Sequence, residues 1–169
     1  IHLVGHDWGS VQSWEKVCTD EGRWASFTSI SGPCLDHLGH WMRSGDVGDE
    51  RTALRRLRDR ARQVPKSWYV AAFHTPLGPV PWRAGLADRW PTVLANLEGI
   101  DPAAHRSTDT LARDGVHGIE LYRANVSDRM RRPRQRTTSV PVQLVVPRAD
   151  RFVGPTMARA AVPHCSRVE

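Results

Sequence analysis

The chain has 169 residues, a net charge of +6, 40% hydrophobic residues and 25% charged residues. This balance is typical of an ordinary soluble globular protein or of part of one. No stretch is long and apolar enough for a membrane-spanning helix, so we expect no membrane span. Because the chain begins with Ile1 inside an apolar run and not with methionine, we expect that sequence precedes it.

The basic residues concentrate in two segments, 51–62 and 129–136. The first segment carries Leu54, Leu57 and Ala61 at helical spacing with arginines on the other faces, which is typical of a solvated helix rather than a phosphate-binding surface. No zinc-finger spacing, RNA-binding aromatic motif or helix-turn-helix pattern accompanies the charge. We therefore expect no nucleic-acid partner.

Cysteine occurs only at Cys18, Cys34 and Cys165. An odd number of widely spaced cysteines, without a CxxC pair or a metal-ligand pattern, predicts reduced structural thiols and no metal site. Reduced thiols favour a cytoplasmic location.

The first third of the chain has the pattern of a parallel β-α-β unit. Residues 1–4 (IHLV) predict a short buried strand, residues 8–19 an amphipathic helix, and residues 25–30 (ASFTSI) a second strand. Strand, helix and strand within about thirty residues are typical of neighbouring parallel strands.

After Pro33 the periodicity becomes helical, and a strand signal returns only at residues 140–146. The expected fold class is therefore α/β, with a parallel sheet in residues 1–34, a mostly helical insertion in residues 35–136 and a return to the core in residues 137–169. The further predicted helices cover residues 50–64, 67–74, 87–96, 107–113, 117–127 and 156–162.

The motif Gly5-His6-Asp7-Trp8-Gly9 lies between the first strand and the first helix. A nucleophile elbow reverses the chain so sharply that small residues are needed two positions on either side of the nucleophile. The Asp7 carboxylate could attack an electrophilic carbon and form an ester, and the Trp8 backbone N–H would contribute to the oxyanion hole. The alternative is a glycine-rich turn in which Asp7 is only a helix N-cap. His6 is interpreted as a packing residue.

This elbow, preceded by IHLV, resembles the elbow of epoxide hydrolases and haloalkane dehalogenases in the α/β-hydrolase superfamily, and the resemblance extends over essentially the whole chain. The Ser31-Gly32-Pro33 segment resembles the point where such proteins enter their cap. The resemblance implies a partial α/β-hydrolase sheet interrupted by a helical cap in residues 35–136, and it implies no cofactor.

The same resemblance implies three further site residues. Asp150, in VQLVVPRADRFV, matches the acid of the catalytic triad, with a loop-capping aspartate as the alternative. Tyr69, in SWYVAAFHTP, and Tyr122, in GIELYRAN, resemble the two cap tyrosines that polarise an epoxide oxygen, with packing residues as the alternative. Glu120 stands where the family often has asparagine.

The family's general base is a histidine well beyond the acid, in a Gly-His-aromatic context, but only 19 residues follow Asp150 (169 − 150 = 19). His164 lies in a different context and is interpreted as a packing or surface residue. The family's upstream His-Gly-x-Pro loop is absent as well. We therefore expect a parent protein that hydrolyses a small apolar epoxide with water, and a chain that is inactive alone.

Three alternatives remain open. A haloalkane dehalogenase has the same nucleophile and a tryptophan after it, as Trp8 stands here. A non-catalytic remnant or interaction module would also lack the base. Residues 29–37 (SISGPCLDH) resemble actinobacterial proteins in which this domain is fused to a short-chain dehydrogenase, although nothing in the 169 residues encodes a dinucleotide fingerprint. The oligomeric state is left open.

Overall fold

The computed structural model describes residues 1–44, 53–104 and 108–169. The chain divides into two compact units, one made of Ile1–Ser67 and Asp128–Glu169 and the other of Trp68–Ser127. The first is called the sheet unit below and the second the helical unit. The cap boundaries expected at residues 35 and 136 stay a prediction.

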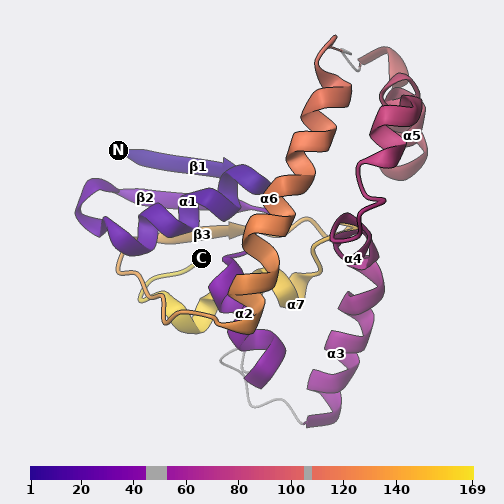
Figure 1. Ribbon diagram of the computed structural model, residues 1–169. Helices are drawn as coiled ribbons and strands as arrows, with labels where there is room; N and C mark the ends of the chain where they lie inside the picture. The colour runs from indigo at the N-terminus through magenta and orange to yellow at the C-terminus, as the bar shows by residue number, and fades with distance from the viewer. Residues whose placement is uncertain (45–52, 105–107) are drawn as a thin grey trace. The chain divides into compact units, whose positions relative to one another are not determined.

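The sheet unit contains a parallel sheet of three strands in the order β1 (His2–His6), β2 (Ser26–Ile30) and β3 (Val142–Val145) (Figure 1). Helix α1 (Trp8–Thr19) and the short 3-10 helix η1 (Glu21–Arg23) connect β1 to β2. The mixed α/β class and the parallel order are confirmed, and α1 has the predicted bounds. The three strands start or end within two residues of the predicted positions.

The core of this unit forms because α1 places Trp14 and Val17 against the sheet. The Trp14 ring meets Phe27 of β2 edge to face, with ring centroids 5.0 Å apart, and Val142 of β3 belongs to the same buried cluster. Beyond β3, Val168 forms a parallel bridge with Val142, so the last residues run alongside this strand.

The rest of the sheet unit is helical. It contains α2 (Leu35–Ser44), α3 (Ala53–Lys66), α7 (Pro155–Ala158) and the 3-10 helix η4 (Arg159–His164). The predicted helix over residues 50–64 corresponds to α3, and its first three residues lie outside the described part of the chain. The helix predicted over residues 156–162 is a short α-helix that continues as a 3-10 helix.

Helix α2 is an α-helix that the sequence pattern missed. Its buried face combines Leu38 and Trp41 with the polar residues Asp36 and His37, so this face is not purely apolar. Gly39 allows a close approach, because a Cβ there would lie 2.8 Å from the carbonyl oxygen of Arg129.

The helical unit contains α4 (Trp68–Phe73), the kinked segment η2 (Trp82–Leu86), α5 (Ala87–Glu98), the 3-10 helix η3 (Pro102–Ala104) and most of α6 (Leu111–Arg131). Helices α4 and α5 match the predictions over residues 67–74 and 87–96 within two residues. In the described residues, no helix is both long enough and apolar enough to cross a bilayer.

The prediction of two helices over residues 107–113 and 117–127 is wrong, because α6 runs without a break from Leu111; residue 107 lies outside the described residues. The expected break falls at Gly115. There the missing side chain makes room for a neighbouring ring, since a Cβ would lie 2.2 Å from Cδ2 of Trp82. Gly115 therefore serves packing rather than helix termination.

Candidate functional site

Asp7 occupies the sharp turn between β1 and α1. Its φ of 50° and ψ of −126° lie in a region that residues with a side chain rarely adopt. Its N–H donates to the carbonyl oxygen of Ile30 at 3.0 Å, and its own carbonyl accepts from Val11 N–H at 3.0 Å. The side chain is exposed and makes no capping hydrogen bond, so the simple N-cap alternative is wrong.

The turn is tightly packed on two sides by glycines. A Cβ at Gly5 would lie 2.6 Å from Cα of Ser10, and a Cβ at Gly32 would lie 2.3 Å from the carbonyl oxygen of Asp7. A Cβ at Gly9 would meet nothing within 4 Å, so the expectation that Gly9 prevents a collision is wrong. Gly32, which is distant in sequence, has the role expected of Gly9.

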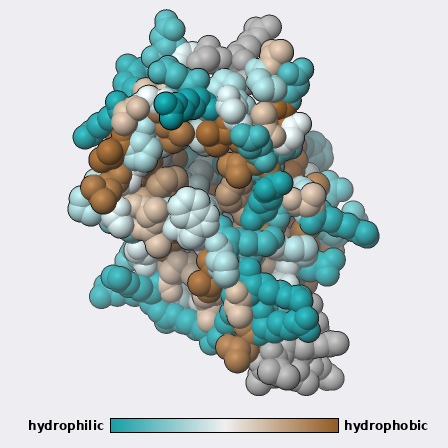
Figure 2. All heavy atoms as spheres, turned by 90° about the vertical axis from the view of Figure 1, so that its right-hand side faces the viewer, coloured by the Kyte–Doolittle hydropathy of each residue, from teal (hydrophilic) through white to brown (hydrophobic). Residues whose placement is uncertain are grey.

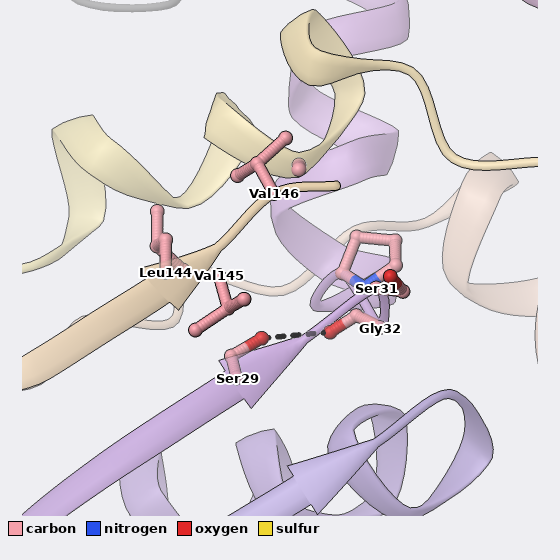
Figure 3. A pocket seen from close by; sticks show the side chains of 8 residues that line it. Ser29, Ser31, Gly32, Leu144, Val145 and Val146 are labelled. Atoms are coloured by element: carbon pink, nitrogen blue, oxygen red, sulfur yellow. Dashed lines mark hydrogen bonds between the residues drawn. The ribbon is translucent and has the colours of Figure 1, made fainter. Parts of the chain in front are cut away.

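The Gly32 carbonyl is a shared acceptor that joins α1 to the end of β2. It accepts hydrogen bonds from Ser10 Oγ at 2.7 Å, Trp14 Nε1 at 3.0 Å and Ser29 Oγ at 3.1 Å. Figure 3 shows the bond from Ser29. Ser10 and Ser29 are also bonded to each other at 2.8 Å. These buried bonds fix the backbone on which the turn rests.

Ser31 is a second residue at this edge with a positive φ, 49°, and strained backbone of this kind concentrates at functional sites. With Ser29 and Gly32 it lines a small pocket at the carboxyl ends of β2 and β3 (Figure 3). Pro33, Leu144, Val145, Val146 and Ala158 complete the lining. The lining is mostly apolar and contains neither Asp7 nor Asp150.

Asp150 lies in the loop after β3. Because the three strands are parallel, this loop leaves the same sheet edge as the Asp7 turn, with β2 between them. Asp150 Oδ1 accepts hydrogen bonds from Phe152 N–H and Val153 N–H, each at 2.8 Å. The loop-capping role is therefore present, and both of its bonds use one carboxylate oxygen.

Two residues of α3 hold this loop, and sequence reasoning missed both. Gln63, which is 7% exposed, donates through Nε2 to the Phe152 carbonyl at 2.8 Å and accepts from Gly154 N–H at 3.1 Å. Lys66 Nζ donates to the Asp150 carbonyl at 3.1 Å. The available signal was a glutamine and a lysine three residues apart, which share one helix face.

Tyr69 and Tyr122 lie together inside the helical unit. Their ring centroids are 5.7 Å apart, and both rings contact Phe73, at 5.6 Å and 5.0 Å. Arg123 donates to the Phe73 carbonyl at 2.8 Å and pairs with Glu120 at 2.7 Å. The structure thus brings the two predicted tyrosines into one aromatic cluster, which Glu120 helps to hold through Arg123.

The histidines differ sharply in environment. His6 is exposed, so its interpretation as a packing residue is wrong. His164 packs, as expected, with its ring stacked on His37 at 4.2 Å. His37 is fully buried and its Nε2 lies 2.8 Å from the Arg136 carbonyl. Burial, followed by the neighbouring His164, lowers the pKa of His37 to about 4.

A buried carboxylate next to His37 ties α2 to the segment that returns to the sheet. Asp36 accepts from Arg129 Nη1 at 2.8 Å and from Arg134 N–H at 2.9 Å, and Arg136 Nε lies 3.6 Å away. The carboxylate is 4% exposed, so these contacts compensate the cost of its burial. The arrangement is structural, because it surrounds Asp36 on all sides with protein groups.

The cysteines are free thiols, and burial raises the pKa of Cys34 and of Cys165 to about 12. A thiol with such a pKa is a poor nucleophile at neutral pH. Among the described residues, no group of three or more His, Cys, Asp or Glu side chains is arranged to hold a metal ion. Asp7 is therefore the nucleophile candidate with an exposed side chain on a strained backbone.

Similarity to known proteins covers almost the whole chain. It is 36% identical over 166 residues to proteins named "Probable oxidoreductase EphD" from Mycobacterium bovis and Mycobacterium tuberculosis. The match covers 92% of this chain but 27% of each relative, so the chain spans about a quarter of their length. No protein-family model matches the chain. The similarity links the chain to one segment of proteins named as enzymes.

Proposed function

We propose that this chain carries the nucleophile and the acid of an α/β-hydrolase of the epoxide-hydrolase type, with a cap in residues 35–136. The observation that supports this most is Asp7, whose exposed carboxylate stands on a strained turn between a parallel strand and a helix. A backbone held at such a φ without a capping hydrogen bond is a cost that a purely structural turn would avoid, because glycine would adopt it without strain.

In the proposed reaction an Asp7 carboxylate oxygen attacks one carbon of a small apolar epoxide. The ring C–O bond breaks, and the departing oxygen takes a proton from Tyr69 or Tyr122, which leaves a hydroxy-ester on Asp7. The Trp8 backbone N–H, at the start of α1, would stabilise the oxyanion when water later attacks the ester. Asp150 would orient a general base through Oδ2, the oxygen that the loop N–H groups do not use.

No residue of this chain is assigned as that general base. His164 is stacked on His37 in the sheet unit, so it is a packing residue in the proposal. The name oxidoreductase belongs to proteins of which this chain matches about a quarter, and the proposal concerns the matched segment alone. No cofactor is assigned to this segment, and the cytoplasmic location remains a proposal.

Mass spectrometry after incubation with styrene oxide tests the first half-reaction. The expected result is addition of one epoxide to the Asp7 peptide, with no adduct in Asp7→Asn and slower labelling in Tyr69→Phe and Tyr122→Phe. Asp20→Asn, at another exposed carboxylate, is the matched control and should label normally. An unlabelled Asp7 in folded protein would rule the proposal out, whereas halide release from a haloalkane would favour the dehalogenase alternative.

A further inference from the structure

Helix α3 contacts other parts of the sheet unit through polar side chains. Gln63 is buried and bonded to the loop after β3, and Arg60 Nη2 donates to the Trp41 carbonyl at 3.2 Å. Lys66 reaches the same loop through the Asp150 carbonyl. A helix usually buries an apolar face, but the side of α3 that contacts these segments consists of hydrogen-bonding side chains.

Three apolar residues in the part of α3 whose side chains the structure describes are exposed on one side of the helix. Leu57 is 64% exposed and Val64 is 58% exposed, and the exposed Ala61 lies between them. These three residues, called the outer strip below, recur at intervals of four and three, so they form one line along two helical turns. Isolated exposed apolar side chains are ordinary, but a continuous helical line of them indicates a contact surface.

Positive charge borders the outer strip. Arg58 and Arg62 are exposed and each follows a residue of the strip by one position, which places them along one side of it. The α3 sequence, ALRRLRDRARQVPK, contains Asp59 as its only acidic residue, and the whole chain has a net charge of +6. An occupant of this surface must therefore be apolar along its centre and negative at its border.

We propose that α3 binds the surface of an anionic phospholipid bilayer. The outer strip would enter the boundary between headgroups and acyl chains, while Arg58 and Arg62 would contact lipid phosphates, as in other basic amphipathic helices that lie in the interface plane. Such a helix lies on the membrane and does not span it. The phosphates of a nucleic acid would contact the arginines but not Leu57 and Val64, so the outer strip favours lipid as the partner.

Co-sedimentation of the full chain with vesicles tests this surface. Vesicles of phosphatidylglycerol and phosphatidylcholine in equal parts should bind the chain, and vesicles of phosphatidylcholine alone should bind it at least about tenfold more weakly. Arg58→Glu with Arg62→Glu should lower partitioning at least about thirtyfold, since each basic residue near such a surface contributes about fivefold. Leu57→Ser with Val64→Ser should lower it about tenfold or more.

The matched controls are Leu77→Ser, at a leucine that is 72% exposed, and Arg113→Glu, at an arginine whose side chain is 66% exposed. Both should bind within about twofold of the parent chain, because neither lies on α3. Circular dichroism of each variant verifies that it is folded. The proposal would be overturned if Leu57→Ser with Val64→Ser left the binding unchanged, if neutral vesicles bound the chain equally well, or if the chain did not bind vesicles at all. The first of these results would mean that α3 binds anionic surfaces through its arginines without inserting apolar side chains.

Discussion

The Asp7 turn and helix α3 both belong to the sheet unit, yet they relate to the sequence in opposite ways. At the turn, a local motif of five residues predicted a strained backbone, and the observed φ of 50° confirms it. At α3, the spacing of Leu54, Leu57 and Ala61 predicted a solvated helix with arginines on its other faces. The helix is present, but Leu57 and Val64 are exposed and Gln63 is buried.

The difference follows from what determines each feature. The strained backbone of the turn follows from the sharp reversal between a strand and a helix, which a short motif encodes, although Gly32 outside the motif also packs against it. The orientation of α3 depends on hydrogen bonds to a loop about ninety residues further along the chain, at Phe152 and Gly154. Hydrophobic periodicity cannot report such bonds, because a buried glutamine with satisfied partners costs little. Figure 2 shows one face of the molecule, on which hydrophobic side chains are exposed between hydrophilic ones.

The largest expected effect is at the turn itself. Gly32→Ala should destabilise the chain by at least about 3 kcal/mol, because the new Cβ would collide with the Asp7 carbonyl and with Ser10 Cβ, which neither backbone can avoid cheaply. Gly9→Ala is the matched control and should be neutral or stabilising by up to about 1 kcal/mol, since its Cβ meets nothing and alanine favours helix. Urea denaturation followed by circular dichroism measures both. Equal losses in the two variants would mean that the turn is not packed against Gly32.

The prediction of Gly32 as a packing residue could not come from the motif alone. The motif contains Gly5 and Gly9, and the sequence treats them as equivalent. Gly5 is confined by the backbone of Ser10 directly after the motif, Gly32 at the end of β2 is confined by Asp7 and Ser10, and a Cβ at Gly9 would meet nothing. For the same reason α1 was predicted with correct bounds, whereas α2, with buried Asp36 and His37, was missed. Local patterns specify elements, and partners distant in sequence specify the faces that these elements bury.

The second expected effect is a loss of stability in acid that is caused by His37, a buried polar residue whose burial the sequence did not predict. His37 packs against His164, with Asp36 and His40 on its own helix and the Arg136 carbonyl at Nε2. Its folded pKa is about 4 against 6.5 in the unfolded chain, so the unfolded state binds the proton first. The free energy of unfolding should therefore be unaffected by His37 above pH 6.5 and should decline as the pH falls from 6.5 towards 4. Below pH 4 it should be lower by about 3 kcal/mol.

Urea denaturation at a series of pH values measures this loss. In His37→Gln the decline between pH 6.5 and 4 should be smaller by that amount, because glutamine does not titrate and its amide can still donate to the Arg136 carbonyl. His117→Gln, at an exposed residue of α6, is the control and should keep the decline of the parent chain. An unchanged decline in His37→Gln would show that other groups cause it.

A third and smaller effect tests the polar docking of α3. Gln63→Leu should destabilise the chain by about 2 kcal/mol, because it leaves the Phe152 carbonyl and the Gly154 N–H without their partner. The measurement is hydrogen exchange of the Gly154 amide together with urea denaturation, and faster exchange of that amide is expected. If Gln63→Leu were neutral or stabilising, apolar contacts would hold α3 in place. The orientation of α3 would then not depend on hydrogen bonds to a distant loop.

The smallest effect is expected on the outer side of the same helix. Leu57→Ser should change the free energy of unfolding by less than about 0.5 kcal/mol, because the side chain is 64% exposed and burial contributes little there. Thermal and urea denaturation without lipid measure this, so a lipid-binding role of the residue does not interfere. A loss comparable to that of Gln63→Leu would show that Leu57 is buried in solution. Near-neutrality at Leu57 beside a clear loss at Gln63 would establish that α3 turns its polar side inward.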